Sequence, residues 1–307
     1  MQRLLPLGLL LAVAACESRP PASAAAADSA PPEPTRLHSV TGFSTPEGVV
    51  HDTEADVYFV SNINGAPAAR DGNGFISRMR PDGTVDSLRF IDGTRSGVTL
   101  HAPKGMALRG DTLWVSDIDA LRAFDRRTGA ALAAVEFGSR VAFLNDVAIG
   151  PDGAVYVTDT GFRFNADGSM EKADTPAGVY RLGAGGSIEV VSQDSALGAP
   201  NGITTHEGTL LIGNAGGPGV SAWTPGQEQL AHAGNSRAEV DGLEVLADGR
   251  IIASSWTDSS IVVVGDSGTR LIAGLPAPAD FTVDRTRRRV IVPLFTENRV
   301  EIWQLGE

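Results

Sequence analysis

The sequence predicts an all-β fold, a six-bladed β-propeller with four strands in each blade. A ten-residue pattern at 144–153 combines a polar pair, a short apolar run and a turn, and it recurs six times along the 307 residues. Successive copies are about 40 residues apart in three intervals and about 57 in the other two, and a four-stranded unit of ~40 to 45 residues is typical of propeller blades. A second apolar stretch follows each copy, as the next strand of a blade would.

The first strand of each predicted blade begins at one repeated polar position. In chain order this position holds Glu47, Lys104, Asn145, Asn201, Asp241 and Asp280. Because the first strand of every blade lines the central channel of a propeller, these six side chains should meet around one axis. Lys104 should then lie beside Glu47 and Asn145 and opposite Asp241.

The second strands are predicted from runs rich in Val, Ile, Tyr and Phe that Gly, Asp and Pro bound. They are residues 57–61, 112–116, 154–158, 209–213, 250–254 and 289–293. Residues 179–182 and 188–191 fit the outer two strands of the third blade. Four second strands end in Asn62, Asp117, Asp159 and Asn214. These side chains are expected to orient the axial residues.

The folded domain is predicted to span residues 36–307, with its N-terminal strand closing the last blade. The sixth copy leaves room for only three strands before the chain ends. Residues 37–41 are therefore expected to pair beside residues 300–304, which would remove the open edge of the array.

The N-terminus is predicted to be an export signal with a lipid anchor. Residues 1–16 contain Arg3, an apolar run and Ala-Ala before Cys16, as in a signal peptide. The segment resembles the lipobox of bacterial lipoproteins, in which Cys16 would be acylated; the alternative is an ordinary signal peptide with an incidental cysteine. Cys16 is the only cysteine, so no disulfide forms within the chain. Residues 17–35, rich in Ala, Pro and Ser, fit a flexible tether. The protein is thus expected in the bacterial cell envelope, lipid-anchored and facing the periplasm or the exterior.

The axial residues favour a calcium site. Carboxylate and amide oxygens suit Ca2+, which takes ~6 to 8 oxygen ligands, better than zinc, although another divalent cation would also fit. Glu47, Asp241 and Asp280 bring three negative charges and Lys104 one positive, so a divalent cation would balance the group. The alternative is that these are ordinary turn residues at strand starts.

Four motifs carry a resemblance to a known family. They are Pro46-Glu47-Gly48, Asn145-Asp146, Pro200-Asn201-Gly202 and Asp241-Gly242. With this order and spacing, residues 37–307 resemble the senescence marker protein, gluconolactonase and luciferin-regenerating enzyme family of six-bladed propellers, relatives of paraoxonases and diisopropyl fluorophosphatase. The resemblance implies that Glu47, Asn145, Asn201 and Asp241 hold a catalytic divalent metal, usually calcium. Asp280 is a further axial candidate.

Two departures from the family bear on the substrate and the mechanism. Gluconolactonase-type members carry an Arg where this chain has Phe143, so a sugar acid lactone is disfavoured. Paraoxonases carry a His, assigned a role in activating water, where this chain has Lys104. Lys104 would be a base only with a strongly lowered pKa, whereas as a cation it would stabilise an oxyanion or neutralise Asp280. Asp146 resembles a residue that holds a second, structural calcium in paraoxonases.

Two long loops are expected to overhang the metal, at residues 62–74 and 159–178. The second contains Phe162, Arg163 and Phe164, which are candidates for contacting the substrate. Alternatively, the loops are tolerated surface insertions. His51, His101, His206 and His232 have no metal-ligand spacing and fit turn or surface positions. Only His101, which closely precedes Lys104, is an alternative candidate for facing the pocket.

Composition and motifs narrow the function to two hypotheses. A formal net charge of −12 argues against binding nucleic acid, and the chain has no Gly-rich phosphate loop and no Gly-x-Ser-x-Gly element. The first hypothesis is a monomeric calcium-dependent hydrolase of a small lactone or related ester. The metal would polarise the carbonyl, with Asp241 as base or nucleophile by resemblance and Lys104 as electrostatic helper. The second is a non-catalytic, metal-stabilised sensor or binding propeller.

Overall fold

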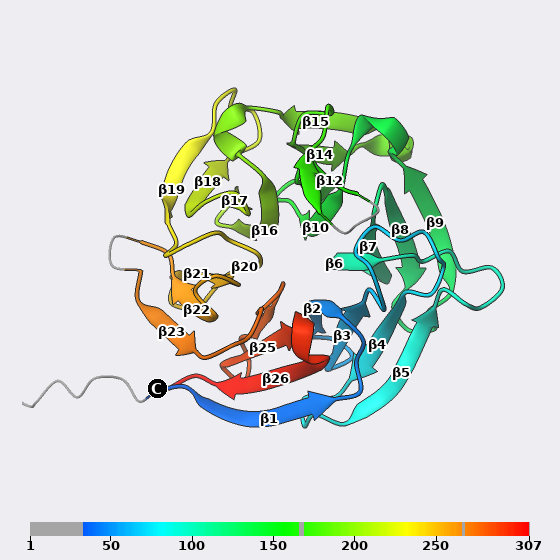
Figure 1. Cartoon of the computed structure of the whole chain (residues 1–307), viewed down its shortest axis with the longest axis vertical. Helices are drawn as coiled ribbons and strands as arrows, with labels where there is room; N and C mark the ends of the chain where they lie inside the picture. Colours follow the sequence, from blue (N-terminus) through cyan, green and yellow to red (C-terminus); the bar gives the residue numbers. More distant parts are fainter. Residues whose placement is uncertain (1–32, 166–168, 266–267, 307) are drawn as a thin grey trace, which may run out of the picture. The chain divides into compact units, whose positions relative to one another are not determined.

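Six four-stranded antiparallel sheets surround a central axis in the computed structural model (Figure 1). The structure describes residues 33–165, 169–265 and 268–306. The predicted six-bladed propeller is therefore confirmed. The predicted signal peptide, Cys16 and residues 17–32 of the tether lie outside the described residues. No helix of the described ranges is long and apolar enough to cross a membrane.

Each blade runs from an inner strand at the axis to an outer strand at the rim. The first three blades are β2 (Pro46–Asp52), β3 (Val57–Asn62), β4 (Phe75–Met79), β5 (Val85–Asp92); β6 (Pro103–Arg109), β7 (Thr112–Asp117), β8 (Ala120–Asp125), β9 (Ala131–Glu136); and β10 (Leu144–Ile149), β11 (Val155–Asp159), β14 (Gly178–Leu182), β15 (Ile188–Ser192). The last three are β16 (Pro200–His206), β17 (Thr209–Asn214), β18 (Gly219–Trp223), β19 (Ala231–Asn235); β20 (Leu243–Val245), β21 (Ile251–Ser255), β22 (Ser260–Val263), β23 (Arg270–Ala273); and β24 (Thr282–Asp284), β25 (Arg289–Leu294), β26 (Arg299–Gln304), β1 (Thr35–Thr41). Short 3-10 turns are η1 (Gly138–Arg140), η2 (Ala184–Gly186), η3 (Ser195–Leu197) and η4 (Phe295–Glu297).

The N-terminal strand closes the ring as expected. β1 pairs antiparallel with β26, with Val40 opposite Val300 and Thr41 opposite Arg299. Arg36 adds an ion pair to Glu301, at 2.9 Å between Nη1 and Oε1. The sixth blade thus combines the first strand of the domain with its last three, and β26 is left with no free edge.

The predicted second strands match the observed ones to within one residue, but the inner strands of the last two blades are shorter than predicted. β20 and β24 begin two residues after Asp241 and Asp280. The backbone at these two positions bonds to a neighbouring strand instead. Asp241 N donates to Ser254 O at 3.0 Å, and Asp280 N donates to Glu47 O at 2.9 Å.

The core consists of apolar clusters, several of which lie between neighbouring blades. In one cluster Trp114 and Leu121 of blade two pack with Val147, Val157 and Tyr180 of blade three. Burying apolar surface contributes about 25 cal/mol per Å², so contacts of this kind hold adjacent sheets face to face. Packing between blades thereby fixes where each inner strand meets the axis.

The long segment at 159–178 contains structure that the sequence did not predict. β12 (Phe162–Phe164) and β13 (Met170–Lys172) form a separate two-stranded hairpin beside the third blade. Arg163 Nε donates to Glu171 Oε1 at 2.7 Å across this hairpin. The segment at 62–74 contains no strand.

Candidate metal-binding and catalytic site

The six axial residues lie side by side because the backbones of neighbouring inner strands nearly touch. A Cβ at Gly105 would lie 2.2 Å from Asp146 Oδ1, and a Cβ at Gly202 would lie 2.4 Å from Asp241 O. Real Cβ contacts are never this short, so any larger residue at these two positions would push the strands apart. The Asp280 to Glu47 backbone bond completes the ring between the last blade and the first.

Buried hydroxyl groups tie the axial backbone of one blade to the next. Thr158 Oγ1 donates to Asn201 O at 2.7 Å, Ser254 Oγ donates to Ala279 O at 2.9 Å, and Ser116 Oγ donates to Asn145 O. The sequence reasoning missed these ties. The sequence feature that could have indicated them is a Ser or Thr just before the end of a second strand. It is present at Ser61, Ser116, Thr158 and Ser254.

The polar residues that end four second strands hold the turns that lead into the axial residues. Asp159 Oδ1 accepts from Phe143 N at 2.8 Å, and Asn214 Oδ1 accepts from Ala199 N at 2.9 Å. In the same way, Asn62 Oδ1 accepts from Ser44 N. Asp117 Oδ1 accepts from both His101 N and Ala102 N. These side chains therefore act on the backbone two or three residues before each axial position and do not contact the axial side chains through these bonds.

The four candidate ligands present oxygens with few protein partners. Glu47 is 5% exposed, and its Oε2 is buried with no hydrogen-bond partner among the described residues. Asn201 Nδ2 donates to Asp241 Oδ1 at 2.9 Å, which leaves the amide oxygen of Asn201 available. A buried carboxylate oxygen without a partner is costly, and a bound cation would satisfy it.

This donor set fits a hard cation. In the described ranges, no group of three or more His, Cys, Asp and Glu side chains is arranged to hold a metal. The proposed set would not form such a group, because it has two carboxylates, Glu47 and Asp241, and two amides, Asn145 and Asn201. Calcium accepts carboxylate and amide oxygens alike, so the residues present fit it.

Burial raises the pKa of the carboxyl groups at the axis. Burial raises the pKa of Asp241 to about 7, against hydrogen bonds from Trp256 and Asn201 that lower it. Burial also raises the pKa of Glu47 well above its usual value, and the charge of Asp241 adds to the shift while that of Lys104 opposes it. Without a cation, the ionised site is therefore destabilised by desolvation and by repulsion between like charges.

Lys104 is enclosed by protein. Its residue is 1% exposed, its Nζ donates to Ala102 O at 3.0 Å, and the same atom lies 4.1 Å from the ring centroid of Phe143. Burial lowers the pKa of Lys104 to about 8, while the charges of Glu47 and Asp117 raise it. The ammonium thus lies against the turn before its own strand and the ring at position 143, where it still interacts with Glu47.

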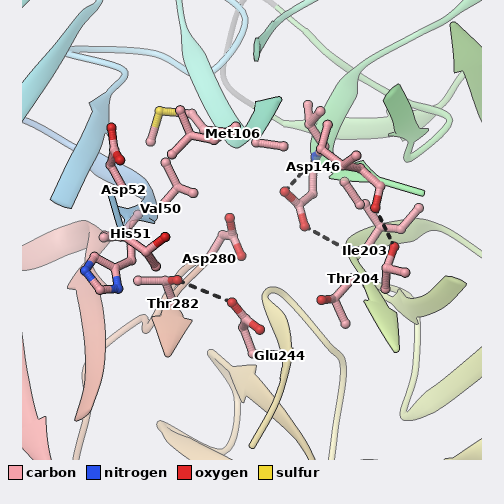
Figure 2. Close-up of a pocket in the computed structure, with 18 of the residues that line it drawn as sticks. Val50, His51, Asp52, Met106, Asp146, Ile203, Thr204, Glu244, Asp280 and Thr282 are labelled. Atoms are coloured by element: carbon pink, nitrogen blue, oxygen red, sulfur yellow. Dashed lines mark hydrogen bonds between the residues drawn. The ribbon is translucent and has the colours of Figure 1, made fainter. Parts of the chain in front are cut away.

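Further carboxylates line a separate cavity in the channel. This cavity has a volume of about 500 Å³, and its acidic lining residues are Asp52, Glu54, Asp146, Glu244 and Asp280 (Figure 2). The described residues that line it include none of the four candidate ligands. Asp280 therefore belongs to this cavity, although the charges of Asp146 and Glu47 both add to the burial that raises its pKa. Glu244 was missed because it lies three residues beyond the repeated position.

Asp146 is held by backbone donors from two blades. Its carboxylate accepts from Val147 N at 2.6 Å and from Ile203 N at 2.7 Å. Burial raises the pKa of Asp146 to about 7, although these two backbone hydrogen bonds act to lower it. Asp146 thus links β10 to β16 directly. Its resemblance to a residue that holds a structural calcium stays a prediction.

Aromatic side chains gather at the end of the channel where the inner strands start. The rings of Phe143 and Phe164 are 4.9 Å apart between centroids, and those of Trp256 and Phe295 are also 4.9 Å apart. His101 Nδ1 accepts from Gly72 N at 3.0 Å, so this histidine fastens the segment at 62–74. Trp256 was missed, although it directly follows the second strand β21, as Phe295 directly follows β25.

Comparison with solved structures supports the fold. A gluconolactonase from Xanthomonas campestris is 22% identical, with 91% of this chain and 96% of that chain covered and a TM-score of 0.66. A streptogramin B lyase is 13% identical, with 89% and 97% covered and a TM-score of 0.59. A chain of a nidogen/laminin complex is 17% identical, with 75% and 80% covered and a TM-score of 0.57. No protein-family profile and no curated protein matches the sequence.

The raised carboxyl pKa values predict an unusual pH dependence of stability. A group whose pKa is higher in the folded state binds more protons when folded, so the metal-free domain should become more stable as pH falls from 8 to 5.5. In chelator we expect Tm to rise by a few degrees over this range, and Asp241→Asn should reduce the rise. Saturating calcium should reduce the rise as well, and the part that remains should come from carboxylates outside the ligand set, such as Asp146. A Tm in chelator that falls or stays constant over the range would contradict the electrostatic description of the site.

Proposed function

We propose that this protein is a calcium-dependent hydrolase of a lactone or related ester. The observation that carries the proposal is the buried Oε2 of Glu47, which has no hydrogen-bond partner among the described residues. Glu47 interacts with the charge of Asp241, to which Asn201 is hydrogen-bonded. The similarity to a solved gluconolactonase supports this reading, since the four residues occur in the motifs on which the family resemblance rests.

Glu47, Asn145, Asn201 and Asp241 would hold the calcium, or another divalent cation, through their side-chain oxygens. When bound, calcium supplies a Lewis acid for the carbonyl oxygen of the substrate and neutralises the carboxylates. Asn201 and Trp256 then have a second task, because their hydrogen bonds fix the orientation of the Asp241 carboxylate.

Asp241 would move the proton. As general base, its carboxylate takes a proton from water while the water oxygen bonds to the carbonyl carbon. The ring C–O bond then breaks, and the proton passes to the departing alkoxide, so that a lactone yields one hydroxy acid. As nucleophile, the carboxylate would instead form an acyl ester that water hydrolyses.

Lys104 would act through its charge. Because it is enclosed beside Phe143 and interacts with Glu47, it can lower the energy of negative charge that develops in the site. It does so without displacing the candidate ligands, since its ammonium is bonded to Ala102 O.

The fold also permits a non-catalytic reading, in which the metal stabilises a sensor or binding propeller. A chain with a comparable fold was solved as part of a nidogen/laminin complex. Lactone turnover decides between the two readings.

Calcium binding tests the ligand set. Glu47→Gln and Asn145→Ala should each weaken calcium affinity by about tenfold or more, because each removes a charged or neutral oxygen ligand. Asp152→Asn is the control, since Asp152 lies in an outer hairpin turn and pairs with Arg181. Calorimetry on the three variants and the parent gives the affinities. Equal calcium affinity in all four proteins would contradict calcium binding at the axial residues.

Turnover tests the role of Asp241. In calcium buffer the parent should hydrolyse members of a panel of lactones and aryl esters, and Asp241→Asn should lose at least about a hundredfold in kcat, as expected for loss of an acid–base group. Product release is followed by pH indicator. If the parent is no faster than Asp241→Asn on every compound, the non-catalytic reading is favoured.

Lys104→Met separates the two roles of the lysine, because Met keeps most of the stem and removes the charge. We expect this variant to bind calcium at least as tightly as the parent, since a positive charge near Glu47 is gone, and to lose most of its hydrolytic activity. Calorimetry and lactone turnover measure the two effects. Full activity would show that Lys104 only balances the carboxylates.

We further propose that the chain is an exported lipoprotein, acylated at Cys16 and held off the membrane by residues 17–35. Expressed in a bacterium, the parent should partition with the membrane fraction and label with a fatty-acid analogue. Cys16→Ser should abolish the labelling. Labelling that persists in this variant would exclude Cys16 as the attachment point.

A further inference from the structure

Trp256 combines an exposed aromatic face with a place beside the candidate base. It directly follows β21, and its indole N–H lowers the pKa of the nearby Asp241 carboxyl group. The residue is nevertheless 39% exposed, which is high for a large aromatic side chain. The ring therefore lies beside Asp241 with an accessible apolar face.

Phe295 supports this ring from the neighbouring blade. The two ring centroids are 4.9 Å apart at an interplanar angle of 49°. Phe295 packs in turn against a buried cluster of Ile63, Ala102 and Ile118. Its backbone N–H donates to Ala277 O at 3.0 Å. Trp256 and Phe295 thus form a fixed apolar surface, which we call the aromatic wall.

Several cationic side chains at this end of the propeller have partners. Arg70 pairs with Asp119 at 2.7 Å, Arg163 pairs with Glu171 at 2.7 Å, and the ring of Phe143 covers the Lys104 ammonium. While these charges are engaged, the aromatic wall offers an accessible apolar surface that can select among substrates.

We propose that the aromatic wall binds an apolar alkyl or aryl substituent of the substrate, so that the substrate is a lactone with an apolar side chain and not a polyhydroxylated one. This inference rests on the proposed lactone hydrolysis at Asp241. Burying apolar surface on an aromatic face is favourable at about 25 cal/mol per Å². Hydroxyl groups placed there would lose hydrogen bonds to water without replacement.

Substrate pairs that share a lactone ring test the wall. For γ-nonalactone, which carries an alkyl chain, Trp256→Ala and Phe295→Ala should each raise KM about tenfold, whereas KM for unsubstituted γ-butyrolactone should change by less than about twofold. The parent should prefer γ-nonalactone to D-glucono-1,5-lactone in kcat/KM. Trp223→Phe is the control, since the indole of Trp223 donates to Gln227 O in a different blade.

Trp256→Phe separates the wall from the hydrogen bond. Phe keeps an aromatic face but cannot donate to Asp241, so kcat should fall for both γ-lactones while KM for γ-nonalactone stays within about threefold of the parent. Thermal unfolding confirms that each variant is folded. Equal changes in KM for both γ-lactones in Trp256→Ala would contradict substrate binding at the aromatic wall, and so would a preference of the parent for the glucono lactone. Neither result would contradict the proposed hydrolase activity.

Binding without turnover keeps the inference testable if the hydrolase proposal fails. When the parent hydrolyses no lactone, tryptophan fluorescence is titrated with γ-nonalactone in calcium buffer. Quenching that occurs in the parent and in Trp223→Phe but not in Trp256→Phe supports the wall alone. No quenching in the parent, or unchanged quenching in Trp256→Phe, overturns it.

Discussion

The close approach of six inner strands at one axis is the constraint on which the rest of the structure depends. At Gly105 and Gly202 the neighbouring backbone leaves no room for a Cβ. Hydroxyl groups such as that of Thr158 then bridge to the next blade, where the backbones are close enough for one side chain to span them. Packing between blades and the closing strand β1 keep the ring at this spacing.

This constraint creates the chemistry of the channel. Strands that meet so closely bring Glu47, Asn145, Asn201 and Asp241 together with little water around them, so their oxygens are desolvated and the pKa values of the carboxyl groups rise. A folded protein tolerates such a cluster of buried carboxylates when a bound cation or protonation neutralises their charge. The same crowding encloses Lys104. Its ammonium group donates a hydrogen bond to Ala102 O, and its charge interacts with Glu47.

The channel holds carboxylates in two places. Asp146, Glu244 and Asp280 are among the residues that line the cavity of Figure 2, whereas Asp241 lies beside Trp256, which packs against Phe295. At the end where the inner strands start, residues such as Asp159 hold the turns that lead into the axial residues.

The sequence by itself determined the blade count, the second strands, the closure by residues 37–41 and the convergence of the repeated polar residues. All of these follow from a local pattern that recurs, and a repeat needs no knowledge of distant contacts. It did not determine that β20 and β24 start late, that Phe162–Phe164 pair with Met170–Lys172, or that Asp280 lines a cavity that Asp241 does not line. It also did not reveal that Trp256 lies beside Asp241 or that Phe143 covers Lys104. Only the tertiary structure decided these points, because each depends on how side chains from different blades share the space around the axis, and that space is set by packing between sheets far apart in the sequence.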